Sequence, residues 1–361
     1  MPIDCDGPTS TARQPLSFCN GGCRRKDGSD DSATATAGTL GLGSVIDQRR
    51  DDGSLRHLIT LEGLRRDEIE ALLERAQHYA RGLAQGTARS HALRGVQVAT
   101  LFAEPSTRTR VSFELAGRRL GADVMNLELQ LSSRVKGETM LDTVYTLQAL
   151  HFDVLIIRDA QPGVLAEVVA HVAPRVSVLS AGEAHLSHPT QGLLDALTVR
   201  QHKGAIEALS IAIVGDIRHS RVARSAYQVF RLLGVRELRI VGPPALLPED
   251  DEFLGCKRFE TLEQGLEGVD VVMMLRIQKE RFAETQVPDG SEYFARYGLT
   301  AQRLARARSD AIVLHPQPMN RGIEIASEVA DGPQSVIRAQ VTNGIAVRMA
   351  ALETVASRLA R

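Results

Sequence analysis

The stretch "GVQVATLFAEPSTRTRVSFE", residues 95–114, predicts a buried strand that runs through a short loop into a helix. Its first part is almost continuously apolar, as expected for a strand covered on both faces. Pro105 restricts Glu104 to extended backbone, so the helix is expected to begin just after it, with Ser106 as a capping residue. A strand followed directly by a helix is half of a βαβ unit.

The start of this helix is also a candidate anion site. The backbone N–H groups of Thr107, Arg108 and Thr109 are expected to point at whatever lies before the helix, and the helix dipole favours negative charge there. A well-capped helix with arginines in water is the alternative interpretation. The Gly-x-x-x-x-Gly-Lys and Gly-x-Gly-x-x-Gly spacings are missing from the sequence, so ATP and dinucleotides are not expected ligands.

Outward from this stretch, strand and helix patterns alternate along the chain. Helical spacing covers residues 66–83 and 189–202, and the last helix is expected within 333–360. Alternation of this kind predicts an α/β protein with two doubly wound parallel-sheet domains linked by helices. The further strands are expected at 122–127, 153–158, 175–180, 209–215, 237–242, 270–275 and 310–315.

The expected domains are residues 55–185 and 200–335, with residues 336–361 forming a helix that packs back on the first. Residues 1–50 are rich in small and polar side chains and are expected to be a disordered extension.

Composition excludes several classes of protein. The 361 residues include 43 basic and 44 acidic ones, a net charge of −1, so no overall field attracts nucleic acid or an anionic membrane. The longest apolar runs are far below the roughly 18 residues of a membrane span. The first residues lack the pattern of a secretory signal, so a cytoplasmic location is expected. The four cysteines lack the spacing of a zinc site and are expected to be free thiols.

A second motif is "SHPTQGLLDAL", residues 187–197. Pro189 suits the first position of a helix, which makes His188 the cap, and His188 shares a face with Gln191 three residues on. A neutral His188 could donate to a carbonyl oxygen that gains negative charge. An ordinary loop histidine is the alternative.

Four more stretches carry polar groups beyond the ends of helices or strands. Each also has a plain interpretation as a solvated loop, a charged strand end or a tight turn. They are "SSRVKGET" (132–139), "VGDIRHSRVARSA" (214–226), "MLRIQKERF" (274–282) and "VLHPQPMNRGIEI" (313–325).

Together these motifs supply many cations and hydroxyls, but no Ser-His-Asp order, metal cluster or evident covalent nucleophile. Such a set favours chemistry by positioning and electrostatics on polyanionic reactants. Transfer of a group from a small phosphorylated donor fits it.

The motifs "STRTR", "SSRVKGET", "HPTQGLLDA", "LRIQKER" and "HPQPMNRG", in this order over residues 55–358, resemble those of aspartate carbamoyltransferase catalytic chains. The resemblance implies transfer of a carbamoyl group from carbamoyl phosphate to L-aspartate in de novo pyrimidine synthesis. It implies no metal or organic cofactor.

The resemblance also implies site residues. Ser106, Thr107, Arg108 and Thr109 would hold the phosphate of carbamoyl phosphate. Thr109, Arg158 and His188 would polarise its carbonyl, and Gln191 with the carbonyls of Pro316 and Gln317 would bind its amine. Arg221, Arg276 and Gln278 would hold the aspartate carboxylates. Ser132 and Lys136 would reach into a neighbouring subunit's site, and the residues implied in catalysis are Arg108, Thr109, Lys136, Arg158 and His188.

The implied assembly is a homotrimer with shared active sites, and the polar N-terminal extension is similar to that of forms that associate with a dihydroorotase or a dihydroorotase-like chain. Two alternatives stay open. Ornithine carbamoyltransferases share "STRTR", although their substrate has a cationic side chain. An inactive scaffold homologue is the other, although Arg108, His188 and Lys136 are all present.

Overall fold

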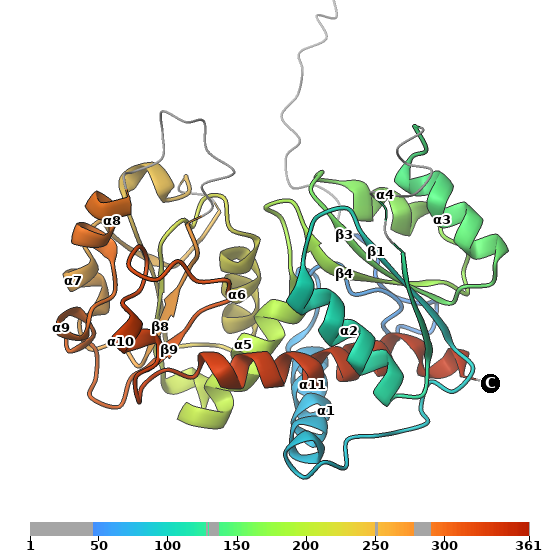
Figure 1. The fold of residues 1–361 in the computed structure, drawn as a ribbon, viewed down its shortest axis with the longest axis horizontal. Coiled ribbons are helices and arrows are strands. Elements are labelled where there is room, and N and C mark those ends of the chain that lie inside the picture. Colours follow the sequence, from blue (N-terminus) through green and yellow to red (C-terminus); the bar gives the residue numbers. More distant parts are fainter. Residues whose placement is uncertain (1–45, 128, 130–136, 250–251, 278–289, 361) are drawn as a thin grey trace, which may run out of the picture. The chain divides into compact units, whose positions relative to one another are not determined.

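The computed structural model describes residues 46–360 except 128, 130–136, 250–251 and 278–289, and two parallel sheets dominate it (Figure 1). The first sheet has the strand order β2-β1-β3-β4. The chain order reverses between β1 and β3, and ligands of open α/β sheets bind beyond the strand ends at such a point. The strands are β1 Gln97–Phe102, β2 Asp123–Leu127, β3 Val154–Asp159 and β4 Ser177–Glu183.

The second sheet has the order β7-β6-β5-β8-β9 and is also parallel throughout. Its order reverses between β5 and β8, so the segments that follow these two strands are where a ligand site is expected. The strands are β5 Ser210–Val214, β6 Glu237–Val241, β7 Lys257–Phe259, β8 Val271–Met274 and β9 Ile312–Leu314.

Helices cover the sheets, and α5 is the most deeply buried of those described: residues 189–199 are all buried. It packs on α1, α6 and α11, and α11 also packs on α1 and α2. The α-helices are α1 Arg66–Ala84, α2 Thr107–Arg119, α3 Met140–Ala149, α4 Val164–His171, α5 Pro189–Lys203, α6 Arg221–Leu232, α7 Leu262–Leu266, α8 Gly290–Tyr297, α9 Ala301–Leu304, α10 Ser327–Ala330 and α11 Ile337–Ala356.

The α/β class with two parallel sheets is confirmed, and each strand predicted from the sequence is present. The short strand β7 was missed because it is only three residues long and two of them are cationic. Ser106 is at the cap position of α2, as predicted, although its side chain accepts no bond from the helix backbone.

The expected N-terminal extension ends earlier than residue 50. Gln48 is buried, and its side-chain oxygen accepts from the backbone N–H of Ile59 at 2.7 Å. Arg50 donates to the carbonyl oxygen of Val355 at 2.7 Å. Residues 46–50 are therefore held by the folded body. No helix within the described ranges is long and apolar enough to cross a membrane.

His57 makes the fold sensitive to acid. Its Nδ1 accepts from the N–H of Val178 in β4 at 3.0 Å, and burial, together with Arg56 and Arg50, lowers the pKa of His57 from 6.5 to about 3. This contribution to stability is complete above pH 6.5 and is lost as pH falls toward 3. We expect a loss of about 2 kcal/mol between pH 7 and 5 in the free energy of unfolding by urea. His57→Asn, which keeps an acceptor but cannot gain a proton, should lose less over that interval; an equal loss would contradict the assignment.

Candidate active site

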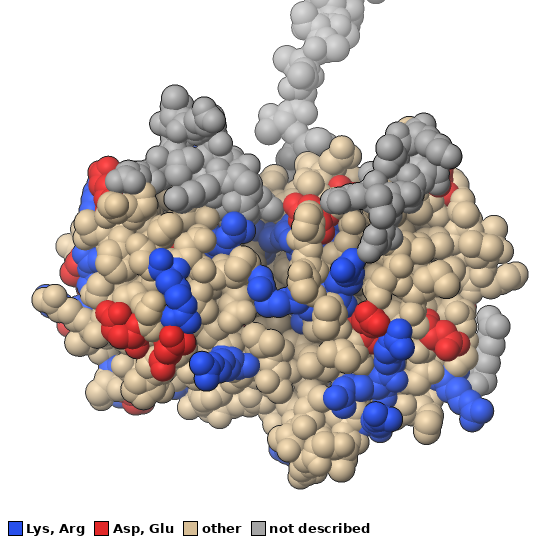
Figure 2. Space-filling model, viewed as in Figure 1, with Lys and Arg blue, Asp and Glu red and all other residues tan. Residues whose placement is uncertain are grey.

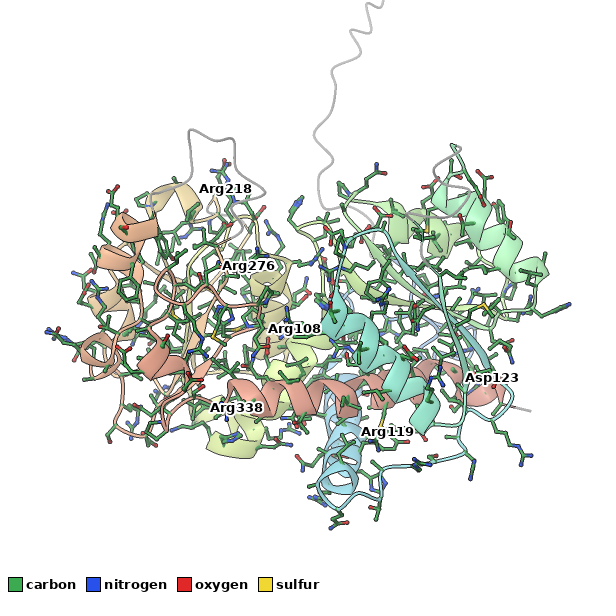
Figure 3. The ribbon with its side chains drawn as sticks, in the orientation of Figure 1. Arg108, Arg119, Asp123, Arg218, Arg276 and Arg338 are labelled. Atoms are coloured by element: carbon green, nitrogen blue, oxygen red, sulfur yellow. The ribbon has the colours of Figure 1, made fainter. Side chains whose placement is uncertain are left out.

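The first part of the site is the N-terminus of α2, which follows β1 at the reversal point of the first sheet. Ser106 is extended (φ −161°, ψ 95°), so the first N–H groups of the helix face away from its body and have no acceptor within it. Thr109 is buried and Arg108 is exposed. Partial desolvation of its guanidinium, and then the charge of Arg276, lowers the pKa of Arg108 although the residue as a whole is exposed. These two arginines, from α2 and from the segment after β8, are neighbours in Figure 3.

Glu104 links two arginines, one in strand β3 of the first sheet and one at the start of helix α6, which follows strand β5 of the second sheet. Its Oε2 lies 3.1 Å from Nε of Arg158, near the end of β3, and accepts from Nη2 of Arg221, the first residue of α6, at 2.8 Å. Each guanidinium also donates to a backbone carbonyl, Arg158 to Ala181 and Arg221 to Ala184. These bonds fix the orientation of both cations.

Gly182 provides the space in which the two guanidiniums converge. Its φ is +117°, a conformation that residues with a side chain rarely adopt. A Cβ at this position would lie 3.0 Å from Nε of Arg221 and 3.1 Å from Nη1 of Arg158. The arginine pair therefore depends on a glycine here.

His188 is at the cap position of α5, as predicted, although its side chain makes no bond to the helix backbone. Its backbone N–H donates to Oγ of Ser225 at 2.9 Å, and Pro189 takes the first helical position as predicted. Burial, together with the guanidiniums of Arg348, Arg158 and Arg221, lowers the pKa of His188 well below its usual value. Its Nδ1 has no hydrogen-bond partner in the described part of the chain. The ring is therefore neutral, and one of its buried nitrogens is left unpaired among the described residues, beside these arginines.

The turn after β9 is fixed by a buried histidine. Nδ1 of His315 accepts from the N–H of Gln317 at 2.9 Å, and its Nε2 lies 3.2 Å from Oε1 of the buried Glu324. Since Nδ1 accepts, the ring proton is on Nε2 and points to the carboxylate. The Gln317–Pro318 bond is cis, and Gln317 has a φ of +57°.

The predicted site residues thus fall into linked groups. Arg158 and Arg221 meet at Glu104, Arg108 interacts with Arg276, and His188 lies in the field of Arg158 and Arg221. Figure 2 shows basic side chains gathered around a hollow in the middle of this face. Ser132, Lys136 and Gln278 lie outside the described residues.

Two participants were missed by the sequence analysis. Glu104 stood in the opening motif, where an acidic residue among cations was a usable signal of an internal ion pair. Gly182, in "SAGEAH", carried no signal because its role depends on two arginines that are distant in sequence.

Comparison with known proteins gives matches over most of the chain. Residues 56–201 match the carbamoyl-P binding domain model of aspartate/ornithine carbamoyltransferase, and residues 207–355 match the corresponding Asp/Orn binding domain model. These two models follow one another along the chain in the order of the two sheets.

Solved structures of aspartate transcarbamoylase from Trypanosoma cruzi are similar at 30% identity. The complex with carbamoyl phosphate and aspartate covers 83% of this chain and 96% of its own, with a TM-score of 0.73. The complex with carbamoyl aspartate and phosphate covers 88% and 99%, with a TM-score of 0.75. The complex with N-(phosphonacetyl)-L-aspartic acid covers 83% and 95%, with a TM-score of 0.74.

Proposed function

The chain belongs to the aspartate/ornithine carbamoyltransferase family, and we infer that it transfers the carbamoyl group of carbamoyl phosphate to the amine of L-aspartate, giving N-carbamoyl-L-aspartate and phosphate. It is an aspartate carbamoyltransferase and so acts in de novo pyrimidine synthesis. The observation that carries this conclusion is the likeness over both sheets to relatives solved with these two substrates.

The N-terminus of α2 binds the phosphate of the donor. Ser106, Thr107 and Thr109 supply hydroxyl groups and backbone N–H groups at the positive end of the helix dipole, and Arg108 adds a charged donor. A phosphate near Arg108 would also offset its repulsion with Arg276. Arg158, His188 and Thr109 donate to the carbonyl oxygen of the donor, where the neutral imidazole adds no charge of its own.

The aspartate carboxylates bind to Arg221, Arg276 and Gln278. Once bound, the neutral amine of aspartate attacks the carbamoyl carbon and a new C–N bond forms. The carbonyl oxygen becomes an oxyanion that Arg158, His188 and Thr109 stabilise. The C–O bond to phosphate then breaks, and the phosphate takes the proton that the amine loses. The Arg158–Glu104–Arg221 bridge holds groups for both substrates in one geometry.

N-(phosphonacetyl)-L-aspartate tests this proposal, because it joins a phosphonate to an aspartate. We expect the chain to bind it at least about a hundredfold more tightly than inorganic phosphate in calorimetry. The matching compound built on L-ornithine is the control, and it should gain little over phosphate. Equal affinity for the two compounds would contradict the proposal.

The active unit is a homotrimer in which Ser132 and Lys136 of one subunit complete a neighbour's site. Exposed apolar side chains support an assembly surface: Val111 and Leu115, four residues apart on α2, are 45% and 38% exposed, and Met125 on β2 is 53% exposed. Association with a dihydroorotase or a dihydroorotase-like chain and a cytoplasmic location stay predictions from the sequence.

Subunit mixing tests the shared site. Arg108→Ala and Lys136→Ala trimers should each be nearly inactive, because every site lacks one group. Hybrid trimers formed by dissociating and reassociating a mixture should regain activity, since some sites then contain neither substitution. Mixing either variant with itself is the control. A mixture as inactive as its components, with hybrid formation verified by mass, would show that Lys136 acts within its own subunit.

A further inference from the structure

A buried chain of hydrogen bonds connects α5 with the turn after β9 through α11. Nε2 of Gln191 donates to Oδ1 of Asp195 at 3.0 Å, and Nε2 of Gln340 donates to the same oxygen at 2.7 Å. Oε1 of Gln340 accepts from the N–H of His315 at 2.9 Å, and His315 in turn accepts from Gln317. We call the two inner residues, Asp195 and Gln340, the amide bridge. Both are at most 3% exposed.

Asp195 fixes the orientation of both glutamine amides in this series of bonds. An ionised carboxylate only accepts, so both glutamine amides must turn their NH₂ groups toward it. Burial raises the pKa of Asp195 to about 7, while the two amide donors and then the buried Arg348 favour its ionised form. Gln191 then presents its Oε1, and not its NH₂ group, on its free side. The NH₂ group of Gln340 is thus used for Asp195, and its side-chain oxygen is left to accept from the N–H of His315.

The two ends of this series of hydrogen bonds reach groups that are assigned to the same part of carbamoyl phosphate, its NH₂ group. Gln191, at one end, and the carbonyls of Pro316 and Gln317, at the other, are acceptors, and the carbamoyl NH₂ group is the donor that matches them. They come from separate segments, one at the N-terminus of α5 and one after β9 in the second sheet. Acceptors on separate segments recognise one NH₂ group only if their spacing is fixed.

We propose that Asp195 and Gln340 are positioning residues that set the carbamoyl specificity of the site, by holding the Gln191 oxygen and the 315–318 turn in register around the substrate NH₂ group. This inference rests on the proposed function. The fixed spacing of these acceptors makes the protein selective for carbamoyl phosphate over acetyl phosphate, which has a methyl group in place of the NH₂. A site built from buried acceptors rejects an analogue that leaves them unpaired.

Gln340→Met tests the proposal, because methionine has nearly the same shape but can neither donate to Asp195 nor accept from His315. The dissociation constants of carbamoyl phosphate, acetyl phosphate and inorganic phosphate are measured at about pH 8. We expect the wild-type chain to prefer carbamoyl phosphate over acetyl phosphate by about tenfold or more, and the variant to lose most of that preference. Affinity for inorganic phosphate, which has no NH₂ group, should stay within about twofold.

Asn343→Leu is the matched control. Asn343 lies one turn along α11, is 4% exposed, and its Nδ2 donates to Oγ1 of Thr198 and Oε1 of Gln201 on α5. The control variant therefore loses buried hydrogen bonds between α11 and α5, but it keeps the bond between Gln340 and the 315–318 turn. It should keep the wild-type preference even if its unfolding temperature falls as far as that of Gln340→Met.

The outcomes separate the two claims. A Gln340→Met chain with the wild-type preference, or an Asn343→Leu chain that loses it equally, overturns the role of the amide bridge. A wild-type chain that does not distinguish the two acyl phosphates also overturns the proposed specificity, whereas one that binds carbamoyl phosphate no more tightly than inorganic phosphate contradicts the proposed function itself. If Gln340→Met does not fold, Gln340→Asn carries the same prediction, because its amide is one methylene too short to reach both partners. The single variant Asp195→Asn keeps an accepting oxygen for both glutamine amides and should therefore retain most of the wild-type preference.

Discussion

Replacing Arg108 with methionine is expected to lower kcat/KM for carbamoyl phosphate by about a hundredfold to a thousandfold, the usual loss for one charged donor to a reacting anion. Arg108 is at the N-terminus of α2, where partial desolvation of its guanidinium and the charge of Arg276 both lower its pKa. An anion bound there relieves this unfavourable environment, and the relief grows as charge gathers on the departing phosphate. Initial rates over a range of carbamoyl phosphate concentrations measure the loss.

Two companion variants sharpen the Arg108 experiment. Arg108→Lys keeps the charge but not the planar fork of donors, so its loss should be intermediate. Arg118→Met removes another arginine of α2, one that is 62% exposed and paired with Glu114 at 3.0 Å, and should change the rate less than about twofold. A similar loss in Arg118→Met would indicate damage to the helix. Full activity in Arg108→Met would show that Arg108 does not bind the phosphate.

Gly182→Ala is expected to lower kcat by up to about tenfold, because both positioning arginines must move by a few tenths of an ångström, less than the roughly 1 Å displacement that costs about a hundredfold. The added Cβ would lie within 3.1 Å of nitrogens of both Arg221 and Arg158. Both guanidiniums must then shift, and the ion pair that each forms with Glu104 weakens. Steady-state rates with saturating carbamoyl phosphate and aspartate measure the effect.

Gly163→Ala is the control for backbone strain. Gly163 also has a positive φ, +89°, but a Cβ there would meet no atom within 4 Å. Both alanine variants should lose about 1 kcal/mol of stability from the left-handed backbone, while only Gly182→Ala should lose activity. Equal activities after correction for folded protein would show that the arginine pair tolerates the displacement.

Much of the fold could be predicted because parallel strands covered on both faces are short apolar runs with helices between them. The strand β7 was not predicted, because Lys257 and Arg258 leave it without an apolar pattern. The cation-rich loops could likewise be predicted, since the ends of strands in an α/β chain are where ligands bind. The family resemblance, and not the pattern, supplied the individual roles.

Other parts of the site could not be read from the sequence, because their roles exist only as contacts. Asp195 is an unremarkable helix residue until Gln191 and Gln340 are seen to share its oxygen, and Gln340 lies 145 residues away along the chain. Gly182 likewise matters only where Arg158 and Arg221 converge. A contact between distant segments leaves no local periodicity or turn signal in a single sequence.

The most direct test of the central claim is the rate at which the purified chain carbamoylates L-aspartate compared with L-ornithine, with the mass of the assembly recorded in the same buffer. The cations Arg221 and Arg276 predict turnover of the dicarboxylate and essentially none of the amino acid with a cationic side chain. Aspartate-specific turnover by a trimer is the expected result. Turnover of ornithine, or a well-folded trimer that turns over neither amino acid, would contradict the account.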